Sequence, residues 1–247
     1  MKPFRFIPAA GAFLLSAALL LPACSSDDSS SVPANTLDIT EANATSTVQG
    51  TTLITFLLIT LIEDAANSGG GACNISGSVT INNTQTLNPP IETNSGTITA
   101  NSCEDSPGVI INGSVNYSFT ENLSTGADSV TVNGGLTLND NGDIATISGL
   151  SFAETSDGAG NYTTSTISFT VSSAGETFSA ALTAPIVGND ADICPTTGGV
   201  QVNGGGGAQV RATLINMGSQ VMIELNPGTG VFAEIANSPV ACTTIFF

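Results

Sequence analysis

From Cys73 onward, hydrophobic and polar residues alternate along the chain, and this pattern predicts a series of β-strands. Successive side chains of a strand point to opposite faces, so each run places its apolar residues on one face and its Ser, Thr and Asn residues on the other. Residues 73–247 are therefore predicted to form a long antiparallel β-domain. The apolar positions are Val109, Ile111, Val115, Tyr117 and Phe119 with Gly113 among them, then Val130, Val132, Leu136 and Leu138, Ile167, Phe169 and Val171, Phe178, Ala180, Leu182 and Ala184, and Val221, Ile223 and Leu225.

Short segments rich in Gly, Asn, Asp and Ser separate these runs and predict hairpin turns, at residues 140–143, 156–161, 173–175 and 226–230. Short connections make strands that follow each other in the sequence neighbours in the sheet, so a meander is expected. One face of such a sheet can remain in water while the other is buried. The apolar end of the chain, Ile245 to Phe247, is interpreted as a last strand that ends in the core.

The segment before the β-domain, residues 37–68, is predicted to be an apolar helix. Asp38 and Thr40 offer oxygens that can cap a helix start, and Glu41 suits the first turn. Residues 51–62 are apolar almost all round, which is typical of a buried helix. Their β-branched residues leave a buried strand as the alternative, and the run is too short to span a membrane.

Something apolar must cover the buried face of the sheet. Either a second sheet layer does so, or the sheet curls around the helix, and the second arrangement is favoured because the helix otherwise has nowhere to bury itself. The predicted fold is mainly β, a curved sheet or partly closed barrel packed on one N-terminal helix, with residues 37–247 as one folding unit.

Residues 1–23 are interpreted as a bacterial lipoprotein signal peptide. Lys2 and Arg5 give a basic start, an apolar core follows, and Ala23 precedes Cys24, the residue predicted to carry a diacylglycerol. Residues 6–21 are too short for a membrane-spanning helix. Residues 24–36 are rich in Ser and are predicted to be a tether. The pattern resembles that of Gram-negative lipoproteins, and this resemblance would place Asp after the cysteine in proteins retained at the inner membrane. Ser25 stands there instead, so outer-membrane attachment, facing the periplasm or the cell surface, is expected.

Charge narrows the classes of partner. The chain has three basic and 20 acidic residues, and removal of the signal would leave Arg211 as the one basic side chain, with a net charge of 1 − 20 = −19. A phosphate backbone needs clustered Lys or Arg, so nucleic acid is excluded as a partner. A solvated acidic surface is the simplest interpretation, and contact with divalent cations or saline surroundings would also fit.

Four cysteines remain after Cys24, and an exported chain is expected to oxidise them to two disulfides. Cys73–Cys103 with Cys194–Cys242 is the favoured pairing of the three possible, because each bond then closes one local segment. A metal site would need Cys-x-x-Cys pairs or histidines, and the sequence has neither.

Candidate catalytic chemistry is sparse. Without histidine there is no Ser-His-Asp or Cys-His arrangement. The acidic pairs Glu63-Asp64 and Glu104-Asp105 could in principle act on a glycoside, but with few aromatic residues they are better interpreted as loop acids. Residues 139–143 lack calcium-loop spacing and predict a hairpin turn, while 203–207 predict a strand connection rather than a phosphate loop. No catalytic residue, metal or cofactor is assigned.

Two stretches resemble uncharacterised Gram-negative lipoproteins and together cover about a fifth of the chain. Residues 37–44 are similar to the opening of an apolar helix after the tether in such proteins. Residues 195–204, 208–211 and 221–225 resemble a β-meander that ends them. The resemblance implies a lipid-anchored envelope protein and no activity.

The function expected from the sequence is a non-catalytic, lipid-anchored structural or interaction module at the outer membrane, bound to the membrane through Cys24. The identity of any protein, glycan or apolar-ligand partner stays open. The alternative is a carrier that holds an apolar ligand within the curved sheet, beside residues 53–62. An enzyme that uses carboxylates alone is the third hypothesis.

Overall fold

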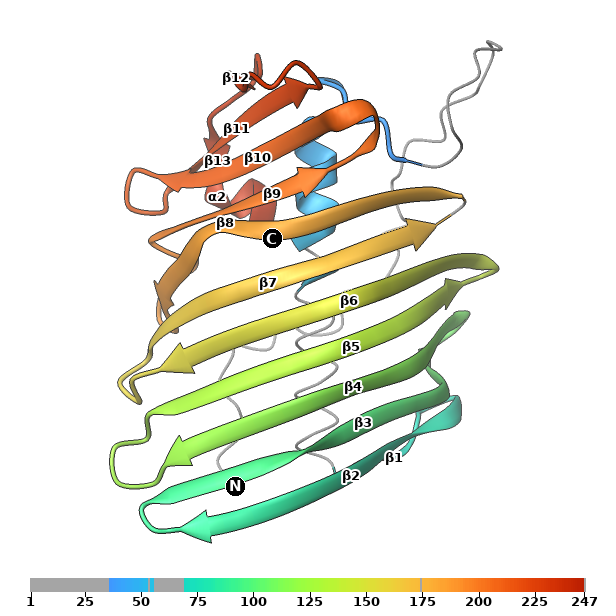
Figure 1. The fold of residues 1–247 in the computed structure, drawn as a ribbon, viewed down its shortest axis with the longest axis vertical. Coiled ribbons are helices and arrows are strands. Elements are labelled where there is room, and N and C mark those ends of the chain that lie inside the picture. The colour runs from blue at the N-terminus through green and yellow to red at the C-terminus, as the bar shows by residue number, and fades with distance from the viewer. Residues whose placement is uncertain (1–35, 53, 56–68, 174, 247) are drawn as a thin grey trace.

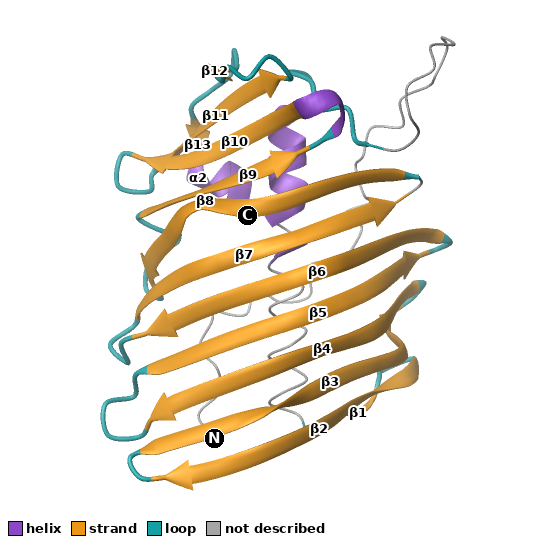
Figure 2. Cartoon of the chain, viewed as in Figure 1, coloured by secondary structure: helices purple, strands orange, loops and turns teal. Residues whose placement is uncertain are grey.

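The computed structural model describes residues 36–52, 54–55, 69–173 and 175–246. Within them thirteen strands form one antiparallel sheet, in the order β1 to β12 of the chain itself, with β13 pairing beside β12 on β11 (Figure 1). The predicted long meander is confirmed, as an open sheet (Figure 2). The strands are β1 (Gly71–Ala72), β2 (Ser76–Asn88), β3 (Ile91–Ser106), β4 (Val109–Asn122), β5 (Asp128–Asp140), β6 (Asp143–Ser156), β7 (Asn161–Ser173), β8 (Glu176–Asn189), β9 (Thr197–Asn203), β10 (Ala208–Ile215), β11 (Gln220–Pro227), β12 (Ala233–Glu234) and β13 (Val240–Ala241).

The alternation in the sequence separates the two faces of the sheet. On β4 the side chains of Val109, Ile111, Val115 and Tyr117 are buried, while Ser114 and Asn116 between them are exposed. The same division recurs on β5, β6, β7, β10 and β11. We call the buried side the core face and the opposite side the outer face.

Strand β8 departs from the predicted alternation. Phe178 and Ala180 are buried as expected, but Leu182 is half-buried and Ala184 is exposed. The pairing of β8 with β9 shifts register between Leu182 and Ala184. An irregular register reorients the side chains that follow it, so the alternation fails from this point to the end of the strand.

The N-terminal helix comprises residues 44–52 and 54–55 and begins later than the sequence predicts. Asn43 closes the turn that leads into it: its Oδ1 accepts from the Thr40 N–H at 2.7 Å, and its Nδ2 donates to the Asp38 carbonyl at 2.9 Å. The segment before it is anchored to the sheet, since the Leu37 N–H donates to the Thr177 carbonyl. Residues 53 and 56–62, which decide between helix and strand for the apolar run, lie outside the described residues.

Ala44 and Val48 of this helix are fully buried and belong to the same core as the buried residues of β10 and β11. Figure 1 shows the helix behind β8, β9 and β10. The predicted helix therefore packs on the core face, towards the C-terminal end of the sheet. No helix in the described ranges is long and apolar enough to cross a membrane.

The end of the chain differs from the predicted strand. Residues Cys242–Phe246 form a short helix, α2, and Ile245 is buried in the core as expected. A second short helical turn, η1 (Gly205–Gly207), joins β9 to β10. It lies against the N-terminal segment, because the Gly205 N–H donates to the Leu37 carbonyl at 2.7 Å.

Candidate functional site

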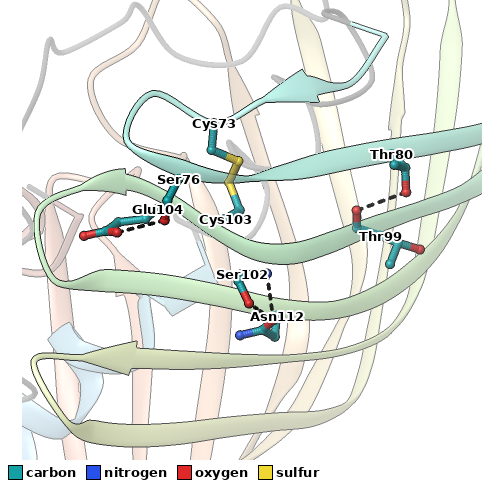
Figure 3. Close-up of a disulfide and its surroundings, with 8 residues drawn as sticks. All are labelled: Cys73, Ser76, Thr80, Thr99, Ser102, Cys103, Glu104 and Asn112. Carbon is teal, nitrogen blue, oxygen red and sulfur yellow. Dashed lines mark hydrogen bonds between the residues drawn. A yellow bond between two sulfur atoms is a disulfide. The ribbon is translucent and has the colours of Figure 1, made fainter.

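The predicted site residues are of two kinds. Cys24, the expected lipid attachment point, lies outside the described residues. The structure contains two disulfides, Cys73–Cys103 and Cys194–Cys242, which is the pairing that the sequence favours. The first joins the segment before β2 to β3 with a Cα–Cα distance of 5.5 Å (Figure 3). The second joins the β8–β9 connection to the start of α2.

Of the acidic pair Glu104-Asp105, the structure describes the side chain of Glu104. The Glu104 carboxylate accepts from the Ser76 hydroxyl at 3.0 Å and from the Gly108 N–H at 2.9 Å, beside the first disulfide (Figure 3). Glu104 thus fastens the β3–β4 turn to β2. The Asp105 side chain and the other pair, Glu63-Asp64, lie outside the described part of the chain.

The loop candidates are turns, as the sequence predicts. Asn141 and Gly142 have φ of 53° and 104° and join Asp140 to its strand partner Asp143. Two consecutive positive φ values are typical of a tight hairpin. Within the described residues no group of His, Cys, Asp and Glu side chains is arranged to hold a metal ion.

Acidic residues gather at one end of the strands, around Tyr162. Burial raises the pKa of Tyr162 to about 12, and the negative charges of Glu154, Asp190 and Asp192 add to that rise. Glu154 is only 5% exposed on the core face and accepts a hydrogen bond from Thr164. The negative charges of this cluster lie close together within the fold. We assign the cluster no ligand.

The outer face has the most extended polar arrangement. Paired residues form one continuous row across the sheet from β2 to β12, and every member is exposed or half-buried. We call it the polar row; its members in order are Asn82, Thr97, Asn116, Asn133, Ser151, Ser168, Ala181, Gln201, Arg211, Glu224 and Glu234. Ala181 is its only apolar residue, and all its charges lie at the C-terminal end.

The centre of the polar row consists of three neutral polar side chains. The side chains of Asn133, Ser151 and Ser168 come from β5, β6 and β7 and, within the described chain, make no hydrogen bond. One amide and two hydroxyls therefore offer donors and acceptors side by side without a charge. These strands are long and paired on both sides, so the backbone below the three side chains is rigid.

Arg211 of β10 lies near the end of the row. Its guanidinium carbon is 4.0 Å from the centre of the Phe232 ring, within the range of a cation–π contact. The other contacts are long: 3.5 Å from Nη2 to the Gln201 oxygen and 4.0 Å from Nη1 to a Glu224 oxygen. The buried Nε–H has no hydrogen-bond partner within the described chain. Arg211 therefore stacks on Phe232, but its N–H groups have few well-placed acceptors.

A network of amides beside Arg211 holds this end of the outer face in place. The Asn203 oxygen accepts from the side-chain amides of Gln201 and Gln209 at 2.8 and 2.7 Å, and Asn203 donates to Ser179 at 3.2 Å. Asn226 donates to Gln209 at 3.1 Å and accepts from two backbone N–H groups of the following loop. These amides satisfy one another's hydrogen bonds. We therefore interpret the network as stabilising the surface rather than as a ligand site.

Sequence reasoning singled out Arg211 as the lone cation but missed Phe232 as its partner. It also missed the polar row, because the row depends on the register of every hairpin. No protein-family model, curated protein or solved structure matches this chain.

Proposed function

We propose that this chain is a non-catalytic, lipid-anchored protein of the bacterial envelope, and that its sheet is a structural or interaction module at the outer membrane. The anchor is Cys24, following the signal at residues 1–23. The observation that carries the interaction role is the polar row, with its uncharged and unpaired centre at Asn133, Ser151 and Ser168.

The chemistry of this face favours a neutral polar partner. Asn and Ser side chains donate and accept hydrogen bonds without a charge, which suits a hydroxyl-rich or amide-rich surface. A strongly acidic chain repels anionic partners, and the guanidinium of Arg211 is shared between Phe232 and Glu224. The absence of histidine from the sequence supports a role without acid–base catalysis.

No observation on the described residues favours the alternative carrier function. The apolar cavity that it requires would adjoin residues 53–62, most of which lie outside those residues.

The anchor is tested by expressing the full chain and Cys24→Ala in a Gram-negative host. We expect the wild-type chain to fractionate with the outer membrane and its N-terminal peptide to carry the mass of a diacylglycerol and an acyl chain. Cys24→Ala is expected to lose that mass. A wild-type chain without lipid would contradict the proposed anchoring.

The interaction role is tested by photo-crosslinking in cells. A photoreactive residue replaces Asn133 or Ser168 in the polar row, and a matched control replaces Met217, which is 89% exposed in the β10–β11 turn. We expect discrete adducts from positions 133 and 168 and none from position 217. Equal labelling from all three positions, or no adducts at all, would refute an interaction role for the outer face.

A further inference from the structure

The two edges of the open sheet are protected to different degrees. At the C-terminal edge, β11 is covered by β12 and β13. At the other edge, β1 pairs with β2 only through Gly71–Val79 and Ala72–Ser78. The rest of β2, residues 80–88, has β3 on one side and no strand on the other within the described residues. In the described part of the structure all of these residues are exposed except Ile81, which is half-buried and lies beside Gly70.

The unpaired backbone groups of this edge can be identified from the ladder. Antiparallel residues alternate between those that bond to one neighbour and those that bond to the other. The Cys73 N–H donates to the Gly77 carbonyl. The backbone N–H and C=O groups of the odd-numbered residues of β2 therefore point towards β1. Beyond Val79 the same alternation leaves the N–H and C=O groups of Ile81, Asn83, Gln85 and Leu87 facing outward.

Natural edge strands are usually blocked by charges, by proline or by brevity. Strand β2 is 13 residues long and contains neither a charged residue nor a proline. Leu87, 59% exposed, adds an apolar side chain to the open edge. The edge is thus suited to accept another strand.

We propose that the free edge of β2 pairs antiparallel with the same edge of a second copy of the chain, about a two-fold axis at Thr84. The segment without a second strand partner among the described residues spans 80–88, and its midpoint is Thr84, so this register uses the whole segment. It places Ile81 opposite Leu87 of the other copy and Asn83 opposite Gln85. The outward-facing odd residues meet one another, so their N–H and C=O groups are satisfied reciprocally.

The side chains fit this register as well. Ile81 and Leu87 share the core face, so each apolar residue meets an apolar partner on the same side of the joined sheet. The outer face then pairs Asn82 with Thr86 and Thr84 with itself. No charge opposes another along the seam. The net acidity of each copy does oppose approach, so dimers are expected to strengthen as salt shortens the Debye length. This pairing is independent of the proposed role of the outer face.

Cysteine crosslinking tests the register. Thr84 directs its backbone groups to β3, so Thr84 and its symmetry mate form a non-hydrogen-bonded pair with Cα atoms about 4.5 Å apart, close enough for a disulfide. Thr86 is the matched control: it is also an exposed Thr of the outer face, but its mate would lie about 14 Å along the strand. After mild oxidation of the full chain in detergent, Thr84→Cys should give a covalent dimer and Thr86→Cys should not. Equal crosslinking, or none from Thr84→Cys, would overturn the proposal.

A second pair of variants tests the edge without a crosslink. Gln85→Pro removes an outward-facing N–H and leaves the bonds to β3 intact, because proline is tolerated at a strand edge. It also removes the side-chain hydrogen bond from Gln85 to Glu92, which Gln85→Ala removes without blocking the edge. In sedimentation velocity we expect wild type and Gln85→Ala to be dimers at concentrations where Gln85→Pro is a monomer with unchanged circular dichroism. A monomeric wild type, or a dimeric Gln85→Pro, would refute the pairing.

Discussion

Removing the Cys194–Cys242 disulfide is expected to destabilise the fold by about 4 kcal/mol. The double variant Cys194→Ala/Cys242→Ala frees the C-terminal segment, which β12 and β13 attach to β11 by only two residue pairs each. The bond closes a sequence separation of 48 residues. In the chain-entropy model a loop of that length contributes about 2.1 + 1.5R ln 48, or about 14 cal/mol/K, which at 25 °C is about 4 kcal/mol.

The same calculation supplies a matched control. The Cys73–Cys103 bond closes a separation of 30 residues, for which the model gives about 3.6 kcal/mol. The two double-alanine variants should therefore lose similar free energies of unfolding, measured by guanidinium denaturation monitored by circular dichroism. If the loss comes from loop closure, the bond acts on the unfolded chain, so its removal should raise the slope of free energy against denaturant as well as lower the midpoint.

A loss below about 1 kcal/mol in the Cys194–Cys242 variant would refute this reasoning, because loop closure would then not be the main contribution. A loss well above that of the other variant would point to native contacts instead. Cys242 is 1% exposed and precedes Ile245 of the core, so the single variant Ile245→Ala separates these contributions. It leaves the bond in place and removes the packing.

The remaining predictions concern pH. Tyr162 and Tyr117 are the two tyrosines of the chain, so an ultraviolet titration of tyrosine reports them alone. Burial raises the pKa of both residues, that of Tyr162 to about 12. Tyr162→Phe should therefore remove the transition near pH 12. Since the folded chain keeps its tyrosine protons to higher pH than the unfolded chain, stability should fall from about pH 10 to about pH 12, and unchanged stability there would contradict the raised pKa values. Burial, with the charges of Glu121 and Asp190, raises the pKa of Asp128 above 3.8. Asp128→Asn should therefore raise the melting temperature at pH 7, where the carboxylate is charged, but not at pH 3. The same gain at both pH values would exclude a charge effect.

The sequence predicted the parts of the fold that depend on local pattern. Alternation on β4 separates buried Val115 from exposed Asn116, and Asn141-Gly142 forms the expected hairpin turn. Cysteine pairing followed from proximity along the chain, because a meander keeps sequence neighbours together in space. The identity and strand order of the β-domain were therefore accessible without a structure.

The features that the sequence did not predict depend on longer-range geometry. The exposed Ala184 follows a register shift, and register is set by the pairing of two strands rather than by one. The helix α2 is five residues long, too short for a helical period to show among β-branched and aromatic residues. Phe232 reaches Arg211 from a loop, so no spacing rule connects them. The open edge of β2 became visible only when the short length of β1 was known.

The position of the two disulfides follows from the open architecture of the sheet. In a meander each strand contacts only its neighbours, as repeats do in a solenoid, so the terminal strands have one neighbour and fray first. Cys73–Cys103 fastens the chain at the β2 end, and Cys194–Cys242 fastens it at the β11 end. The central strands carry no such bond and rely on two neighbours and the core face. The C-terminal bond also holds β12 and β13 beside β11, whereas the bond at the β2 end lies beside β1, and residues 80–88 have no second strand partner among the described residues. The same end of the molecule is thus covalently secured and open to a further strand, which is the arrangement that pairing between two copies requires.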